Sequence, residues 1–370
     1  MPDIRLEQLA DVLVSHSAGV KQGDLVYIES SPVAAPLVRE LHRRILATGG
    51  RPQSHVVVSG VHEALVSMGG DEQLDTLSPR LAAEFELADA RIVIVGDENT
   101  RSLSGAPPER LARIARAREP LRRLAHERTL AGEYMWTVTA YPTQAGAQEA
   151  RMSLSHYENH VFGAALLGAA DPVSAWRNLG DRIRRLAEWL ETVRELRVVA
   201  EDTDLRIGVE GRHWIVCDGT HNLPDGEVFT APVDATVEGT IRFTYRAVFR
   251  RRAVTDVKLR FRAGEVVEAV AAQGQDYLDE MLGLDEGARR PGEFAFGLND
   301  EVKVFTGETL FDEKIGGTVH LALGDAYPES GGTNRSVLHW DMVCDLRRGG
   351  EVHADDEVVY RDGRFLGDRF

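Results

Sequence analysis

Cysteine is scarce in this chain, with two residues, Cys217 and Cys344, among 370. Both lie in apolar, strand-like runs, and neither has a partner at the spacing of a metal-binding motif. This scarcity argues against disulfides and against thiolate metal sites. We expect both residues to be reduced thiols in the protein core.

Lysine and clustered positive charge are also scarce. Of the 43 basic residues only four are lysines, and the formal net charge is −16. The one short basic run, residues 250–252, is typical of a solvated turn. Nucleic-acid binding depends on clustered Lys and Arg that release counterions from phosphates. The composition therefore excludes nucleic acid as a partner.

Long apolar runs are absent. No stretch approaches the roughly 18 to 20 uninterrupted apolar residues of a membrane span. Residues 1–7 lack the basic and then apolar pattern of a signal peptide. We expect a cytoplasmic protein with no membrane partner.

Several loop motifs that bind nucleotides or present a catalytic serine in α/β proteins are also absent. No Gly-x-Gly-x-x-Gly follows a strand and no Gly-Lys-Ser/Thr loop occurs, so nucleotide binding lacks support. Ser102 and Ser104 lie near Gly105 but lack the flanking glycines of a nucleophile elbow. Serine hydrolase chemistry is therefore excluded.

What the sequence does contain is a change of pattern near residue 195, and its length suggests two domains. Buried parallel strands are predicted for three apolar runs, 25–28, 55–58 and 91–95. Helices are predicted for three stretches among them, 33–48, 78–88 and 108–126. We expect residues 1–195 to form a doubly wound α/β domain.

From residue 196 onward the sequence alternates apolar and polar residues between turn signals, as in residues 237–245 and 258–261. This pattern indicates a mainly antiparallel β domain with α+β character, residues 196–370. The overall fold class is therefore α/β, with the β-rich second domain predicted to carry the site.

Three strand-like phrases in the last third each place a potential metal ligand on one face. Because strand side chains alternate, Glu293 shares a face with Ala295 and Gly297 in residues 292–297. His320 likewise shares a face with Ala322 and Gly324 in residues 318–324, and His339 shares one with Asp341 in residues 337–343. The opposite faces are apolar and predict core.

Six side chains remain as candidates for a chemical role: Glu227, Glu293, Glu313, His320, His339 and Asp341. Four carboxylates and two imidazoles suit two divalent ions, and such hard and borderline donors fit zinc, cobalt or manganese better than copper. Each residue alone is more often structural, so the inference depends on the joint pattern.

The motifs resemble those of the metallo-aminopeptidases of the aminopeptidase T and aminopeptidase S type, a thermophilic metalloprotease family that includes leucyl aminopeptidases. The resemblance covers most of the chain and is carried by five phrases, residues 141–145, 152–154, 227–232, 320–324 and 339–342. It implies an aminopeptidase acting on peptides with a free N-terminus. It also implies a homodimer, with residues 1–195 forming the dimer contact and the wall of an internal chamber.

By the same resemblance, the six residues above are expected to be metal ligands, and Tyr327 is expected to line the site. We expect Glu293 to bridge two metals that share an activated water, and Tyr327 to stabilise the oxyanion. The chain departs from the family at one point, because Glu313 precedes His320 by seven residues where the best-known members have five.

Two other functions are compatible with parts of the pattern. His320, His339 and Asp341 resemble the two-histidine, one-carboxylate set of a mononuclear iron, ring-cleaving dioxygenase. Glu227 and Glu293 argue against it, because one iron has no use for them. The second alternative is a non-catalytic binding protein on the same scaffold, which the full ligand set disfavours.

Overall fold

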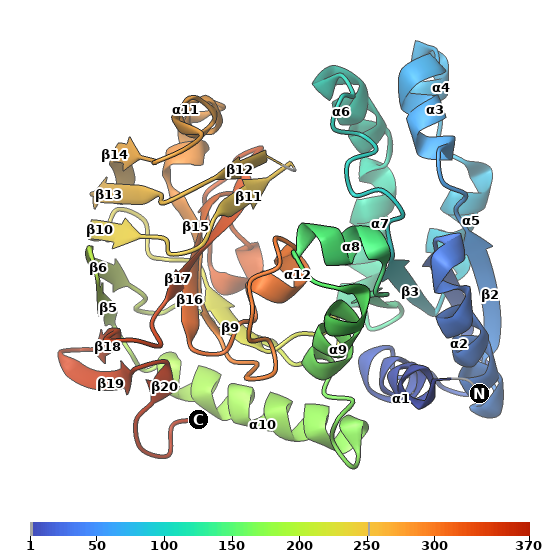
Figure 1. The fold of residues 1–370 in the computed structure, drawn as a ribbon, viewed down its shortest axis with the longest axis horizontal. Coiled ribbons are helices and arrows are strands. Elements are labelled where there is room, and N and C mark those ends of the chain that lie inside the picture. The colour runs from blue at the N-terminus through green and yellow to red at the C-terminus, as the bar shows by residue number, and fades with distance from the viewer. Residues whose placement is uncertain (1–2, 251) are drawn as a thin grey trace. The chain divides into compact units, whose positions relative to one another are not determined.

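The computed structural model describes residues 3–250 and 252–370. Internal contacts divide the chain into two compact units, and each is built on its own sheets (Figure 1). The first unit comprises Met1–Trp176 and Gly219–Pro224, and the second comprises Arg177–Asp218 and Asp225–Phe370. Residue 195, the expected boundary, is the first residue of strand β5 in the second unit.

The first unit is built on a five-stranded parallel sheet with the order β2-β1-β3-β4-β8. Its strands are β1 (Leu25–Ser30), β2 (Arg51–Val56), β3 (Ala90–Val95), β4 (Met135–Ala140) and β8 (Asn222–Leu223). Parallel neighbours need long crossover connections, and helices supply them here. The predicted parallel sheet of helix-flanked strands is confirmed.

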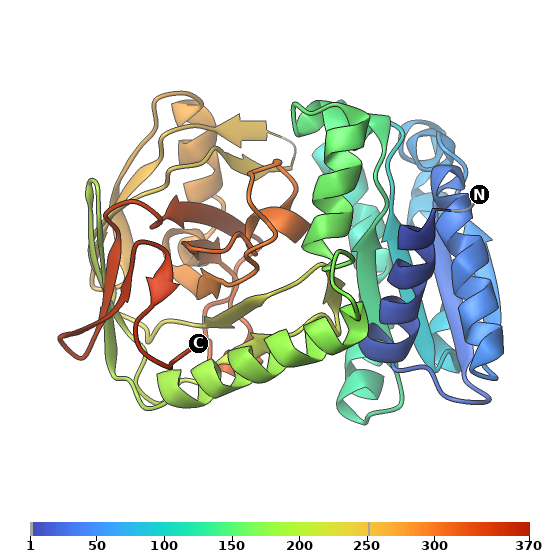
Figure 2. The ribbon, with the colours of Figure 1, turned by 60° about the horizontal axis from the view of Figure 1, so that its bottom comes forward.

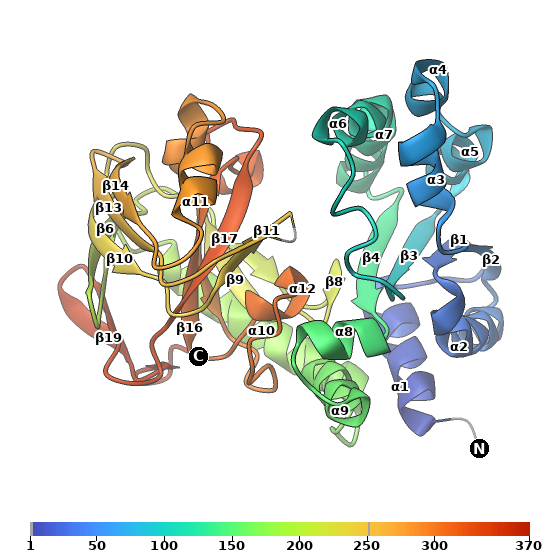
Figure 3. The same cartoon turned by 45° about the horizontal axis from the view of Figure 1, so that its top comes forward.

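Helices lie on both sides of this sheet, with α1 and α2 on one side and α3 to α7 on the other (Figure 3). The helices are α1 (Ile4–Val12), α2 (Ala35–Ala47), α3 (Val61–Met68), α4 (Asp71–Asp75), α5 (Pro79–Leu87), α6 (Pro108–Ala117), α7 (Glu119–Leu130), α8 (Gln144–Glu149) and α9 (Leu154–Ala164). A π-helical turn, Leu13–Ser17, extends α1, and a short 3-10 turn, Pro32–Ala34, precedes α2.

The single helix predicted for residues 108–126 is wrong, because the structure has two helices that meet at Arg118. Pro120 lies in the first turn of α7. Proline lacks an amide hydrogen and its ring clashes with the preceding turn, so α6 cannot continue through this position. Arg118 is thereby placed at the junction, where it caps α6.

Strand β2 is shifted relative to its prediction, since it ends at Val56 and leaves Val57 and Val58 outside. Its first half is polar, so apolar content did not reveal it. Pairing with β1 sets its extent instead, with Leu25 opposite Arg51 and Glu29 opposite His55. Backbone pairing with a neighbour therefore overrides the local pattern.

The second unit contains two larger antiparallel sheets and one ribbon, in agreement with the predicted mainly antiparallel domain. The eight-stranded sheet has the order β14-β13-β10-β6-β5-β18-β19-β20, and the five-stranded sheet has the order β17-β16-β15-β9-β7. The ribbon is formed by β11 (Ala247–Phe249) and β12 (Arg252–Val254).

The strands of the eight-stranded sheet are β5 (Glu195–Ala200), β6 (Thr203–Gly208), β10 (Glu238–Arg242), β13 (Lys258–Arg262), β14 (Glu265–Val270), β18 (Glu351–Ala354), β19 (Glu357–Arg361) and β20 (Arg364–Phe365). Those of the five-stranded sheet are β7 (Ile215–Cys217), β9 (Glu227–Thr230), β15 (Pro291–Gly297), β16 (Thr318–Gly324) and β17 (His339–Asp345). The helices are α10 (Pro172–Leu190; Figure 2), which belongs to this unit from Arg177 onward, α11 (Gln275–Leu282) and α12 (Thr309–Asp312).

The apolar face of the five-stranded sheet forms part of the core of the second unit. Phe294 and Phe296 are fully buried, as the alternation in β15 predicts. The ring of Phe296 lies 5.7 Å from that of Tyr360 and 5.0 Å from that of Phe365, both on the eight-stranded sheet. One face of β15 to β17 is therefore committed to packing, which leaves the other for polar side chains.

None of the helices in the described part of the chain is long and apolar enough to cross a bilayer.

Gly324, the last residue of β16, allows β16 and the start of β17 to approach closely. Its φ is +102°, and a Cβ atom built on it would lie 2.1 Å from the carbonyl oxygen of Leu338. An added methyl group must therefore push the two segments apart, in addition to the conformational cost of a positive φ.

We expect Gly324→Ala to lower the free energy of unfolding by about 2 kcal/mol or more. Gly349→Ala is the matched control, because Gly349 has a similar φ of +70° but nothing within 4 Å of the added methyl. It should cost only about 1 kcal/mol. Denaturant unfolding of both variants measures the difference, and equal losses would contradict the close-approach argument.

Candidate metal centre

Five of the six predicted ligands lie on the five-stranded sheet, on the face opposite the aromatic core. Glu227 begins β9, Glu293 lies in β15, His320 lies in β16, and β17 carries His339 and Asp341 two residues apart. Adjacent strands align their side chains by register, so one sheet face collects these groups from four strands.

Most cross-strand neighbours of these ligands are small, with Val343 opposite His320 as an exception. Ala322 lies between Glu293 and Asp341, Ala295 is opposite His320, Gly324 is opposite His339, and Gly297 is opposite Glu227. Because directly paired side chains have Cβ atoms only about 5 Å apart, larger residues would fill the space above the sheet. Alanine and glycine instead leave room for the ligand side chains to converge.

The ligand atoms form two clusters of three residues each. Glu227, Glu313 and His320 offer one ligand atom apiece within 4.8 Å of one another. The second cluster meets the same distance limit and consists of Glu293, His339 and Asp341. All six predicted ligands are thus brought together, divided into two sets of three.

Glu293 lies between the two histidines. Its Oε1 is 3.1 Å from Nε2 of His320 and its Oε2 is 3.8 Å from Nε2 of His339. Its carboxylate therefore presents one oxygen to each cluster.

A backbone carbonyl orients His339. Nδ1 of this ring lies 2.8 Å from the carbonyl oxygen of Asp325. A carbonyl oxygen can only accept a hydrogen bond, so Nδ1 carries a proton and Nε2 is the nitrogen left to act as a ligand. Nε2 faces Oδ2 of Asp341 at 3.6 Å, which is the orientation that a metal ligand needs.

Glu313 reaches the site from outside the sheet, at the C-terminal cap of α12. The buried carboxylate of Asp312 holds the preceding loop by accepting bonds from the amides of Thr306 and Gly307 and from the Thr306 hydroxyl. This anchored loop brings Glu313 to His320 although seven residues separate them in sequence.

Lys314 is a site residue that the sequence analysis missed. Its side chain is 1% exposed, and Nζ donates to Oε1 of Glu227 at 2.8 Å and to Oε2 of Glu313 at 2.7 Å. Burial opposes its charge, but Glu227 and Glu313 raise its pKa well above the usual value. Two features of the sequence could have indicated Lys314: it is one of only four lysines, and it directly follows Glu313.

Cys217 and Asp225 also lie at the edge of the site, where each offers a ligand atom within 4.8 Å of Glu227. Cys217 pairs with Glu227 across β7 and β9, and its side chain is only partly buried. Burial of the sulfur and the charge of Asp225 raise the pKa of this thiol well above its usual value. A protonated thiol is a poor ligand, so the oxygen and nitrogen donors dominate here.

The crowded carboxylates shift the proton affinities of the site. Burial and the charge of Glu313 raise the pKa of Asp341 to about 8. Burial alone would lower the pKa of His320, but its hydrogen bond to Glu293 and the charge of Glu227 raise it to about 9. In the absence of metal, each cluster thus contains a group whose pKa lies above 7.

Divalent metal ions fit this donor set. Oε2 of Glu227 and Oδ1 of Asp341 are buried and form no hydrogen bond with any described residue. Buried oxygens of this kind are costly unless a cation or a donor satisfies them. Two three-residue clusters of oxygen and nitrogen atoms match the preferences of zinc, cobalt and manganese.

Tyr327, predicted to line the site, lies beside the second cluster. Its ring centroid is 5.5 Å from that of His339 and 5.2 Å from that of Phe229. Partial burial and the charge of Glu293 raise the pKa of its phenol. The hydroxyl is therefore neutral and can donate a hydrogen bond.

Comparison with known proteins covers nearly the whole chain. Residues 3–365 match the family described as thermophilic metalloprotease (M29). Aminopeptidase 2 of Geobacillus stearothermophilus is 28% identical over 97% of this chain and 95% of the relative. Aminopeptidase T of Thermus thermophilus shows the same identity and coverage.

A solved structure, wild-type AmpT from Thermus thermophilus, superimposes with a TM-score of 0.84 and 25% sequence identity. The match covers 98% of this chain and 99% of that one. The mixed α/β fold with its parallel and antiparallel sheets is thus found in a solved relative.

Metal uptake should release protons, because His320 and Asp341 must lose theirs before they can act as ligands. Both pKa values lie above 7, at about 9 and about 8, so the apparent affinity rises with pH across this range. Below the relevant pKa each cluster should lose about tenfold in affinity per pH unit. Zinc titration by calorimetry in two buffers of different ionisation enthalpy counts the protons, and zero release at pH 7 would contradict the assignment.

Lys314→Met should destabilise the chelator-treated protein, because Glu227 and Glu313 lose their buried cation. Breaking a buried pair costs about 3 to 5 kcal/mol. Lys303→Met is the control, since Lys303 is 66% exposed and paired only with Glu301, and it should cost less than about 1 kcal/mol. Denaturant unfolding compares the two, and similar losses would show that Lys314 does not hold the carboxylates.

Proposed function

Because the chain belongs to the thermophilic metalloprotease (M29) family, we propose that it is an aminopeptidase that holds two divalent metal ions in the two clusters of its second unit. The protein is a metallo-aminopeptidase, a hydrolase that acts on peptides. The observation that supports the dinuclear form is the division of six donors into two sets of three.

In this proposal each cluster holds one ion. Glu227, Glu313 and His320 would hold the first, and His339 and Asp341 would hold the second. Glu293 would be the bridge, which agrees with its two oxygens facing different histidines. Bound divalent ions supply an acidified water molecule and a polarised scissile carbonyl group.

Carboxylates of the site recognise the free N-terminus of the peptide substrate. Four carboxylates, Glu227, Glu293, Glu313 and Asp341, surround the site, and Lys314 is the only permanent cation that contacts them among the described residues. The negative surround of Glu227 and Glu313 attracts the ammonium group of a peptide. Removal of only the first residue follows from this charge complementarity.

Proton transfer and oxyanion stabilisation fall to two further groups. Tyr327 has a neutral phenol beside His339 and can donate to the developing oxyanion. The leaving amine requires a proton, which a carboxylate not fully engaged by metal, or a second water molecule, would supply. The identity of the metal, the homodimer with an internal chamber and the cytoplasmic location remain predictions.

The dioxygenase alternative finds no support in the geometry. It requires His320, His339 and Asp341 to hold one iron, but His320 shares its cluster with Glu227 and Glu313 rather than with the other two. A non-catalytic binding role is likewise not needed to explain any feature of the site.

Metal-dependent release of leucine from a leucyl chromogenic amide tests the proposed activity. We expect the chelator-treated protein to be inactive and to regain activity on titration with zinc, cobalt or manganese, with saturation near two ions per chain. An N-acetylated substrate should not be cleaved, because it lacks the ammonium group. Saturation at one ion, or cleavage of the blocked substrate, would contradict the dinuclear aminopeptidase.

Replacing the proposed bridge, Glu293→Gln, should lower kcat by about 100-fold or more, because an amide oxygen cannot supply a second anionic contact. The fold should be retained, as circular dichroism can verify. Glu301→Gln is the control, since Glu301 lies outside the site and pairs with exposed Lys303. Near-normal activity of Glu293→Gln would refute the bridging role.

A further inference from the structure

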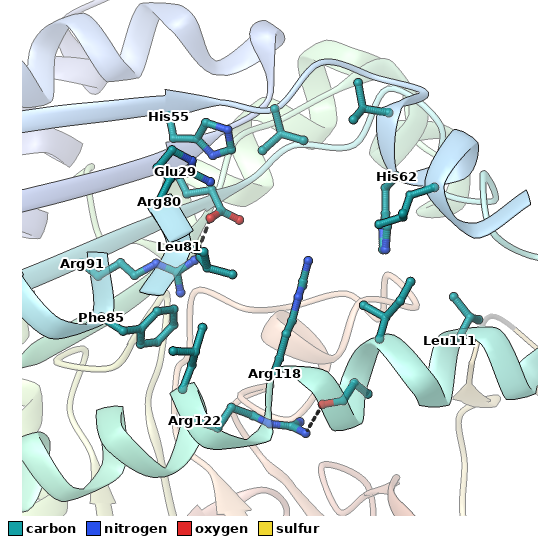
Figure 4. Close-up of a pocket in the computed structure, with 16 residues that line it drawn as sticks. Glu29, His55, His62, Arg80, Leu81, Phe85, Arg91, Leu111, Arg118 and Arg122 are labelled. Carbon is teal, nitrogen blue, oxygen red and sulfur yellow. Dashed lines mark hydrogen bonds and ion pairs between the residues drawn. The ribbon is translucent and has the colours of Figure 1, made fainter. Parts of the chain in front are cut away.

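A second cavity, unrelated to the metal centre, lies within the first unit. It has a volume of about 630 Å³ and is formed between the parallel sheet and the helices α3, α5, α6 and α7 (Figure 4). A cavity of this size suits a small organic molecule.

The sheet side of this cavity is polar. Glu29, His55 and Arg91 line it from three neighbouring strands, β1, β2 and β3. Parallel sheets in α/β proteins are normally apolar on both faces, because helices cover them. This face therefore departs from what packing alone requires.

The helix side of the cavity carries its apolar surface, formed by Leu65, Leu81, Phe85, Leu111, Ile114 and Leu121. The same side also carries His62 and three arginines, Arg80, Arg118 and Arg122. An occupant thus meets both apolar surface and charged groups.

The cationic groups of the cavity are not all neutralised. Arg91 is paired with Glu29 at 2.7 Å, Arg80 is paired with Glu84, and Arg122 is paired with Glu119 at 2.7 Å. Arg118, the fourth arginine of the lining, forms no ion pair with any residue in the described ranges. One guanidinium charge therefore remains available.

Arg118 and His62 both point into the cavity in Figure 4. Nε2 of His62 and Nδ1 of His55 are buried without hydrogen-bond partners among the described residues. Both residues line the same cavity, and burial together with the charge of Arg118 lowers the pKa of His62. An anion between them would satisfy both.

We propose that this cavity binds a small monoanion with an apolar body, a carboxylate carrying an aliphatic or aromatic chain. The carboxylate would contact Arg118 and His62, and the chain would pack against Leu81, Phe85 and Ile114. A single unpaired cation balances one negative charge. A phosphate dianion would carry a second charge with no partner, and Glu29 would oppose it.

Octanoate, octylamine and octyl phosphate test this proposal, because they share one chain and differ only in head group. We expect calorimetry to detect octanoate binding at one site per chain, with octylamine and octyl phosphate at least tenfold weaker. Equal binding of octanoate and octylamine would overturn the proposal, as would tighter binding of octyl phosphate or no binding of any of the three.

Arg118→Gln should weaken octanoate binding at least tenfold, whereas Arg123→Gln, a neighbouring exposed arginine that does not line the cavity, should leave it unchanged. Both variants should keep the melting temperature and the leucyl amidase activity of the unaltered protein. Octanoate bound at the metal centre would still bind Arg118→Gln, so undiminished binding to this variant would also overturn the proposal.

Discussion

The second unit depends on one electrostatic constraint, which is the burial of four carboxylates around a single permanent cation. Glu227 and Glu293 are nearly inaccessible to solvent, and among the described residues the only fixed positive charge in contact with the group is Lys314. Buried charge without compensation costs several kcal/mol per ion. Without metal, the site compensates by holding protons on Asp341 and His320. Bound cations neutralise the carboxylates without these protons. Metal binding should therefore also stabilise the sheet around the site.

The two faces of the five-stranded sheet have different roles, one in packing and one in holding the ligands. Phe294 and Phe296 bury one face of β15 in an aromatic cluster, and the alternate positions carry Glu293 and Ala295. Ligands carried by packed strands are positioned more precisely than ligands on loops. Glu313 and Lys314 come from outside the sheet, and the buried carboxylate of Asp312 fixes the loop that brings them there.

Most of the site could be predicted from sequence because a strand has a period of two residues. Glu293 and His320 alternate with small residues, and His339 and Asp341 lie two positions apart, a pattern that is visible in the order of the amino acids alone. Lys314 was not predictable in this way, since its role depends on a long-range contact with Glu227. The same limit applies to the first unit. Its strands and helices were largely predictable, and the break at Arg118 has a local cause in Pro120, but the polar sheet face required knowledge of how distant segments pack.

The register of Ala322 has a geometric consequence. This residue lies directly between Glu293 and Asp341, which occupy the two strands that flank β16. Neighbouring strands are separated by about 4.8 Å, a spacing set by hydrogen bonds of the main chain. The backbones of Glu293 and Asp341 are therefore two strand spacings apart, a separation that is set by the main chain and not by the side chains of the ligands. During divergence of such a protein, the loops around the site are free to vary, while the spacing of the ligands is inherited with the backbone.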